Sequence, residues 1–217
     1  MRDEAFQLFI EDVGEATFRT PVLDLSLEKY GKLLPGKLLE YWREEGWCGY
    51  ADGLFWTVNP EDYDGLADLW LSGTPYEKVD RYHIVARSAF GNLYAWGERN
   101  HRTLTIACPT HALIGIDKEL RTPAKDPDVA VQAFFASMDR QDFDMKDASK
   151  KYLFERALKK LGPLAPDEIY GFEPALVAGG KNRLENLRKV NLFAHLAILR
   201  ELAAPTVPFA RFDPGEL

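Results

Sequence analysis

Residues 41–63 read YWREEGWCGYADGLFWTVNPEDY and hold the signals that decide the fold. Gly46 is typical of a helix end and predicts a helix over residues 36–45. Residues 53–58 form a short apolar run, as expected of a buried strand. Asn59 then resembles an N-cap, with Pro60 at the first helical position, so a new helix should begin there. The segment is typical of a binding scaffold, because it holds no nucleophile–base pair and no cluster of metal ligands.

The sequence on both sides of this segment predicts helices first and then an antiparallel sheet. Residues 3–13 have apolar side chains at helical spacing, and residues 26–32 form a shorter helical piece. Residues 82–87, 93–96 and 103–107 are rich in β-forming side chains, and turn dipeptides separate them. A further helix should begin near Asp126. The predicted fold class is therefore α+β, an antiparallel sheet flanked by helices.

The last third of the chain predicts a smaller, helix-rich part that packs against the first. A helix is expected from about Ser149 to Gly162, strand-like residues over 168–177, and a closing helix over 181–202. The polar run over residues 139–147 is the candidate boundary. We therefore divide the chain into residues 1–105, a connecting strand and helix over 106–139, and residues 140–217.

The 217 residues carry a net charge of -7, and the acidity is concentrated in the N-terminal part. Residues 1–82 hold seventeen Asp and Glu against eight Lys and Arg, whereas residues 83–217 hold seventeen against nineteen. An acidic surface argues against direct nucleic-acid binding and favours a basic partner, although the carboxylates could equally serve only to solvate the surface. No leader pattern or apolar run of membrane length occurs, so we expect a cytoplasmic protein without membrane contact.

The sequence predicts no catalytic residue, no metal site and no cofactor. His101, Cys108 and His111 are the nearest approach to a ligand cluster, and their spacing fits no zinc pattern. The glycine turn over residues 177–182 lacks the spacing of a phosphate-binding loop. Cys48 and Cys108 are too few for a disulfide framework, and covalent catalysis by either would need a His base that the sequence cannot place beside it.

Aromatic and acidic residues gather between positions 41 and 80, and they have two interpretations. Large aromatic side chains usually bury their area in a core, but Trp and Tyr are also enriched at binding hot spots. We expect the carboxylates to be exposed, and helix capping explains Glu61 and Asp62 in part. On the second interpretation, a protein partner would contact Trp56, Glu61, Asp62, Asp64, Asp68, Tyr76, Glu77 and Asp80.

Two blocks of sequence resemble known families. Tyr41-Trp42, the run from Gly49 to Trp56 and Asn59-Pro60 resemble the GAD-like domain, over about residues 1–105. Residues 169–176, followed by Gly179-Gly180-Lys181, resemble the C-terminal domain of immunity proteins paired with DNase effectors of the type VI secretion system. The resemblance implies a cytoplasmic protein that binds and neutralises a secreted nuclease toxin, and it supplies no catalytic residue.

Two other functions stay open at this point. The region from Gly49 to Trp56 could form the wall of a pocket in an enzyme or a small-ligand sensor. The chain could also be a housekeeping interaction domain that has no toxin partner.

Overall fold

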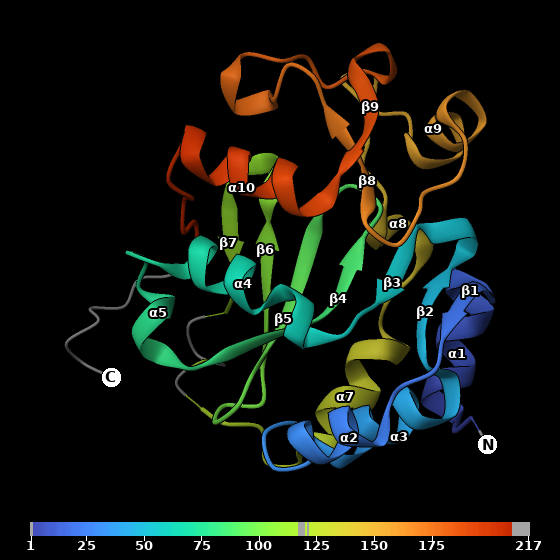
Figure 1. The fold of residues 1–217 in the computed structure, drawn as a ribbon, viewed down its shortest axis with the longest axis vertical. Coiled ribbons are helices and arrows are strands. Elements are labelled where there is room, and N and C mark those ends of the chain that lie inside the picture. Colours follow the sequence, from blue (N-terminus) through green and yellow to red (C-terminus); the bar gives the residue numbers. More distant parts are fainter. Residues whose placement is uncertain (1, 117–119, 121, 210–217) are drawn as a thin grey trace.

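The central sheet has seven antiparallel strands that follow one another in chain order, from β1 to β7 (Figure 1). The computed structural model describes residues 2–116, 120 and 122–209. The predicted α+β class and meander are confirmed, and two unpredicted strands, β1 and β2, extend the sheet. The strands are β1 (Ala16–Thr20), β2 (Trp47–Tyr50), β3 (Phe55–Thr57), β4 (Tyr82–Ser88), β5 (Asn92–Gly97), β6 (Thr103–Ala107) and β7 (Ala112–Ile114).

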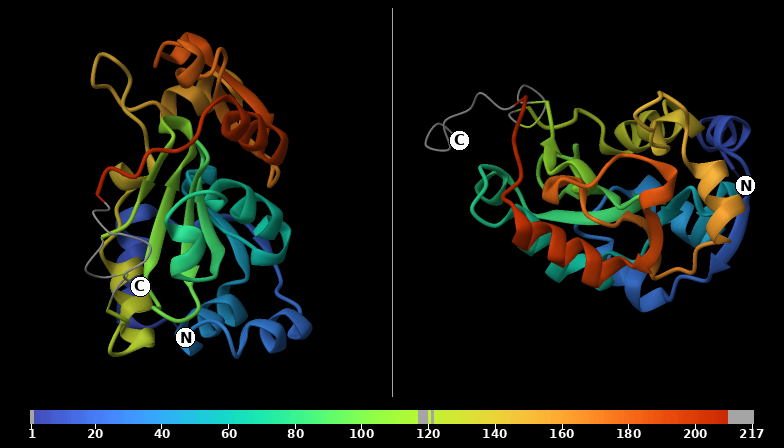
Figure 2. Two further views of the ribbon diagram at one scale, coloured as in Figure 1. Left: turned by 90° about the vertical axis from the view of Figure 1, so that its left-hand side faces the viewer. Right: turned by 90° about the horizontal axis from the view of Figure 1, so that it is seen from above.

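Helices cover both faces of this sheet, as the edge-on view in Figure 2 shows. On one face, α1 (Glu4–Val13), α7 (Pro127–Ala136) and α8 (Arg140–Phe143) pack their aromatic side chains on the strands. The Phe143 ring centroid lies 4.2 Å from that of Phe55 in β3. On the other face, α4 (Asp64–Leu71) and α10 (Leu192–Leu202) lie together, and the Trp70 indole donates to the Leu196 carbonyl at 3.1 Å.

Shorter elements complete the fold. Further α-helices among the described residues are α2 (Asp24–Tyr30), α3 (Gly36–Glu45), α5 (Tyr76–Val79) and α9 (Phe154–Leu161). The 3₁₀ turns are η1 (Ala51–Gly53), η2 (Pro60–Tyr63), η3 (Cys108–Thr110), η4 (Leu176–Ala178) and η5 (Leu184–Asn186). The predicted helix over 36–45 is confirmed to the residue, and so is the strand over 103–107.

The C-terminal part shares one hydrophobic core with the sheet. Its strands β8 (Glu168–Phe172) and β9 (Leu187–Asn191) form an antiparallel hairpin at one end of the sheet (Figure 1). The backbone N–H of Tyr170 donates to the Ala89 carbonyl at 2.9 Å, and that of Leu113 to the Thr206 carbonyl at 2.8 Å. The two parts therefore pack together as predicted, while the boundaries at residues 105 and 139 stay a prediction.

The predicted closing helix over 181–202 is wrong in its first half. Residues 187–191 form β9, and the helix begins only after Asn191, whose side chain accepts from the Ala194 N–H at 3.1 Å. Leu187 and Val190 stand three apart, which suits a helix, but pairing with β8 satisfies the backbone of this segment instead. The helix expected from Ser149 likewise begins at Phe154, and the strand expected over 168–177 ends at Phe172.

Candidate functional site

A groove of about 540 Å³ lies where the β1–β3 edge of the sheet meets the loop before β8 and the start of α10. One wall comes from β1, β2, β3 and η2, and the opposite wall comes from Pro166, Asp167 and Phe193. Five aromatic side chains and two carboxylates line it. These are Phe18, Trp47, Trp56, Tyr63 and Phe193, with Asp62 and Asp167.

The Trp56 side chain is fixed in its wall by the sheet beneath it. Across β3, Trp56 is the register partner of Gly49 in β2 and of Arg87 in β4. A Cβ atom at Gly49 would come within 2.9 Å of the indole ring, so only glycine leaves room for it. The indole N–H donates to the Gly53 carbonyl at 2.8 Å. Trp56 is 4 % exposed, so it acts as a rigid wall and offers only its edge to a partner.

Arg87 lies behind this wall and ties it to the opposite one. The side chain is fully buried, its guanidinium carbon lies 4.6 Å from the Trp56 ring centroid, and Nη2 donates to the Pro166 carbonyl at 2.8 Å. Burial lowers the pKa of Arg87, and the neighbouring Tyr63 and Asp167 oppose this effect. Arg87 therefore holds the loop before β8 against the sheet, which keeps the groove at a fixed width.

Sequence analysis missed the far wall and Arg87. Pro166, Asp167 and Phe193 are more than a hundred residues from Trp56 in the chain, so no local pattern connects them. Arg87 gave a usable signal, since it directly follows the apolar run Ile84-Val85-Ala86 in a segment predicted to be a strand. A charge in such a place must find partners in the core.

Four of the predicted contact residues are acidic, lie close together in the chain on η2 and α4 and are at least partly exposed, and we call them the acidic ridge. Glu61 and Asp62 on η2 and Asp68 on α4 are exposed, and Asp64 is partly exposed. Only Asp62 also lines the groove. Glu61 is partly neutralised by Lys29 at 3.1 Å. The ridge consists of Glu61, Asp62, Asp64 and Asp68.

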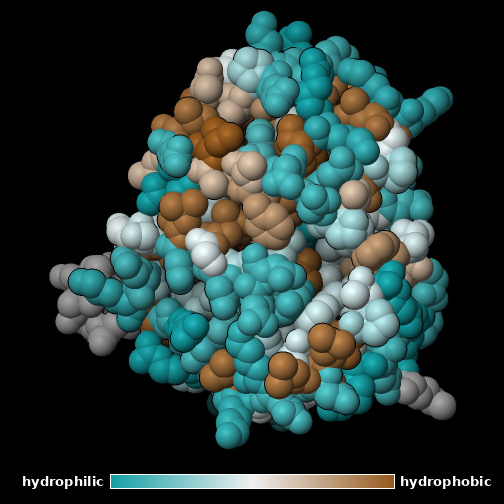
Figure 3. Space-filling view, in the orientation of Figure 1, coloured by the Kyte–Doolittle hydropathy of each residue, from teal (hydrophilic) through white to brown (hydrophobic). Residues whose placement is uncertain are grey.

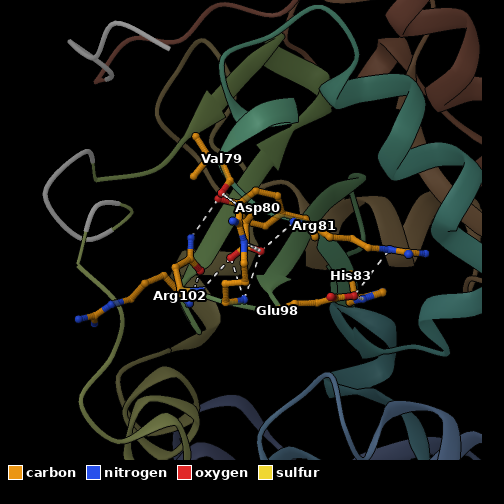
Figure 4. A network of polar contacts seen from close by, with 9 residues as sticks. Val79, Asp80, Arg81, His83, Glu98 and Arg102 are labelled. Atoms are coloured by element: carbon orange, nitrogen blue, oxygen red, sulfur yellow. Dashed lines mark hydrogen bonds and ion pairs between the residues drawn. The ribbon is translucent and has the colours of Figure 1, made fainter. Parts of the chain in front are cut away.

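The expectation that Asp80 is exposed is wrong. Its side chain is 1 % exposed and accepts backbone N–H groups of Arg81 at 2.8 Å, Arg99 at 3.0 Å and Asn100 at 2.8 Å (Figure 4). The carboxylate therefore holds the turn between β5 and β6. A Cβ atom at Gly97 would come within 2.7 Å of the Asp80 carboxylate, which explains the glycine there.

Tyr76 and Glu77 also lie away from the groove. Tyr76 is fully buried, so its place on a contact surface is corrected to the core. Glu77 is exposed on α5, and its carboxylate accepts the Gly73 N–H at 2.8 Å. It lines a wider hollow of about 730 Å³ together with Asp68 and Asp80, but Lys78, Arg81 and Arg99 line the same hollow, so charges of both signs are mixed there.

A buried histidine lies beneath the acidic ridge. His83 is 2 % exposed, with Nε2 2.7 Å from Glu98 Oε1 (Figure 4) and Nδ1 3.7 Å from Asp64 Oδ1. Glu98 also lies 3.6 Å from the Arg81 guanidinium. His83 thus links β4 to the ridge and to the end of β5, an arrangement typical of a structural polar contact.

The two thiols are buried apart from the groove. Cys48 and Cys108 are both inaccessible to solvent, and burial raises the pKa of each thiol. Pro109 breaks the strand into η3, and His111 makes a 2.6 Å contact from Nε2 to the Leu199 carbonyl. Within the part of the chain that the structure describes, no group of three or more His, Cys, Asp or Glu could hold a metal ion.

A second surface of note is apolar and lies over α10. Figure 3 shows hydrophobic side chains gathered there. Ile198 is 53 % exposed and Leu202 is 50 % exposed on α10, and Leu69 on the neighbouring α4 is 37 % exposed. The groove is nevertheless the more specific site, because it combines concave shape with aromatic walls and converging carboxylates.

Comparison with known proteins shows that the two walls of the groove lie in regions matched by two different family models. The family model "GAD-like domain" matches residues 4–110, and the model "T6SS immunity protein Tdi1, C-terminal" matches residues 128–203. The chain thus combines a GAD-like domain with a domain similar to the C-terminal domain of the T6SS immunity protein Tdi1. The groove therefore has Trp56 and Asp62 of the GAD-like domain on one side and Asp167 and Phe193 of the Tdi1 C-terminal domain on the other.

A solved structure has the same fold. The crystal structure of Atu4351 from Agrobacterium tumefaciens is similar with a TM-score of 0.82 and 25 % sequence identity, over 93 % of this chain and 91 % of that chain. No curated protein matches the sequence. Among the described residues of this protein, no helix has the length and apolar character needed to span a bilayer.

Proposed function

We propose that the protein binds a secreted nuclease toxin and neutralises it by covering its active site or its DNA-binding surface, without any chemistry of its own. The observation that carries the proposal is the position of the acidic ridge, which borders a groove built from both family domains. The match of residues 128–203 to the C-terminal domain of a T6SS immunity protein supports a toxin as the partner.

The physical argument starts from the substrate of the toxin. A nuclease must present basic groups to the phosphates of DNA. Exposed carboxylates on Asp62 and Asp68 attract such groups at long range and exclude DNA once they are in place. Residues 1–82, which include the ridge, carry a balance of nine negative charges, seventeen against eight. Rigid apolar walls beside the ridge supply the area that a lasting complex needs.

The test is binding to the cognate nuclease toxin, which is sought first among the genes that neighbour the gene for this protein. The purified protein should form a stable complex with it on gel filtration and should stop its cleavage of plasmid DNA. Asp62→Lys with Asp68→Lys should lower the association rate about tenfold at low salt and weaken its salt dependence. The matched control is Glu11→Lys with Asp12→Lys on α1, where both carboxylates are exposed but lie on the other face of the sheet. No complex with the unaltered protein would refute the proposed function.

A second function follows from the size of the groove. A volume of about 540 Å³ lies within the range of small-molecule sites, so the groove is large enough for a ligand such as a nucleotide. Native mass spectrometry of the purified protein distinguishes the two functions. A bound small molecule or measurable turnover would favour a sensor or an enzyme, whereas an unliganded protein that inhibits the nuclease would favour the immunity function.

A further inference from the structure

We propose that the groove is an anchor pocket for an arginine side chain of the nuclease, held between the aromatic walls and paired with Asp62 and Asp167. The inference rests on the proposed function, since it names the toxin as the source of the side chain. It goes further by assigning the contact to one pocket and one chemical group.

The aromatic lining suits a flat cation. The Phe18 ring centroid lies 5.4 Å from that of Trp56, and the Phe193 ring centroid lies 5.1 Å from that of Tyr63. Phe18 is 40 % exposed and Phe193 is half-buried, so both rings leave surface for a partner. A guanidinium group over such rings is attracted by their negative faces, and more strongly once water is excluded.

The charge of the lining selects a cation over an anion. Asp62 and Asp167 are exposed carboxylates on opposite walls, and neither forms an ion pair with any other described residue. No Lys or Arg occurs among the described residues that line the groove. Arg87 lies behind the Trp56 ring and donates to the Pro166 carbonyl, so it is not part of the groove lining. The charged groups of the lining are therefore the two carboxylates, and the nearby cation is buried.

Arginine fits this combination better than lysine. Its planar guanidinium stacks on aromatic rings and donates from several N–H groups in one plane, whereas the lysine ammonium is a compact, strongly hydrated point charge. The protein already places one guanidinium in this way, since Arg87 lies 4.6 Å from the Trp56 ring. The groove lining places one carboxylate on each wall, Asp62 in the GAD-like domain and Asp167 in the Tdi1 C-terminal domain, so an arginine that entered the groove would lie between the two domains.

The first measurement uses a free probe and needs no toxin. N-acetyl-arginine amide is titrated into the ¹⁵N-labelled protein, and the indole N–H signals of Trp47 and Trp56 are followed. The expected result is saturable shifts with a dissociation constant on the order of millimolar, as suits so small a ligand. N-acetyl-citrulline amide is the matched control, because it has the same shape without the charge. It should bind at least about fivefold more weakly.

Variants then test the two carboxylates. Asp62→Asn with Asp167→Asn keeps the size of both side chains and should weaken arginine-amide binding about three- to tenfold. Glu11→Gln with Asp12→Asn removes the same charge from α1 and should leave binding unchanged. Equal binding of the arginine and citrulline probes, or equal binding by the two double variants, would overturn the inference.

The complex with the nuclease separates this inference from the proposed function. If the unaltered protein binds the nuclease and the Asp62→Asn, Asp167→Asn variant binds at least about tenfold more weakly than the α1 control, the groove is the anchor site. If that variant binds as tightly as the control, the arginine pocket is refuted and the immunity function stands. If the unaltered protein does not bind, both proposals fail.

Discussion

Replacing Asp80 by alanine should destabilise the protein without altering the proposed binding surface. The sequence places Asp80 among acidic residues that resemble contact residues, but its carboxylate faces inward and is 1 % exposed. It accepts the backbone N–H groups of Arg99 and Asn100 in the β5–β6 turn and that of the adjacent Arg81. Truncation to alanine removes all three acceptors at once, and nothing in the new side chain replaces them.

The magnitude follows from the burial of the donors. Asn100 is buried, so the loss of the Asp80 acceptor leaves its N–H unsatisfied, which costs about 1–3 kcal/mol. The N–H groups of Arg81 and Arg99 are partly buried and contribute about 0.5–1.5 kcal/mol each. The ion pair with Arg99 adds little, because that side chain is 73 % exposed. We therefore expect a loss of about 3 kcal/mol.

Urea unfolding measures this loss. With a slope of about 2.5 kcal/mol per molar for a chain of this size, the midpoint should fall by about 1.2 M. The melting temperature should fall by about 6–12 °C. Asp80→Asn keeps one acceptor oxygen and should lose roughly half as much stability.

Asp68→Ala is the matched control, because Asp68 is an acidic residue of the same type that is exposed on the ridge. It should change stability by less than about 0.5 kcal/mol and slow association with the nuclease. If Asp80→Ala unfolds at the same urea concentration as the wild type, the carboxylate does not hold the turn. If the folded Asp80→Ala protein associates more slowly than Asp68→Ala does, its placement away from the contact surface is wrong.

Three further predictions concern the helix cap, the sheet and the thiols. Burial raises the pKa of Asp3, but hydrogen bonds from Phe6, Gln132 and Tyr41 outweigh this effect and lower the pKa below its ordinary value of 3.8. The stabilisation by Asp3 is therefore present above that pH and is lost as the pH falls through the lower folded value. Asp3→Asn should cost about 1 kcal/mol in urea melts at pH 7, and a cost that does not shrink as the pH is lowered from 3.8 would contradict this. Gly49→Ala should cost about 1–3 kcal/mol by collision with the Trp56 ring, and an unchanged urea midpoint would show that the ring can move away. Cys48 and Cys108 should react with a thiol reagent only on unfolding, and rapid reaction of the native protein would show an accessible thiol.

Local signals in the sequence predicted the elements well where neighbouring residues in the chain satisfy the backbone hydrogen bonds. Asn59 caps η2 as expected, because its side chain accepts the Glu61 N–H at 3.3 Å only two residues away. The helix over 36–45 ends at Gly46, which has a positive φ of 87°. These features depend on neighbours in the chain, so a single sequence contains the information.

Elements that depend on distant partners could not be predicted in the same way. Residues 187–191 are spaced like a helix, and only their pairing with residues 168–172 makes them a strand. From the sequence alone, Asp80 resembles a surface charge. In the fold, the turn at Asn100, twenty residues further along the chain, donates a hydrogen bond to its carboxylate. The sequence located one wall of the groove through Trp56 and Asp62, whereas the other wall required the three-dimensional fold.

The groove has buried residues that the sheet holds in place and exposed residues at its rim, and this difference bears on how an immunity protein can match its toxin. Gly49, Trp56 and Arg87 are locked by the sheet, so replacing them disturbs the fold. Asp62 and Asp167 are exposed at the rim, so replacing them changes the charge offered to a partner with little cost in stability. Because each wall carries one of these carboxylates and Arg87 holds the walls together, a partner that binds in the groove as we propose would contact both domains at once, and neither domain alone contains the groove.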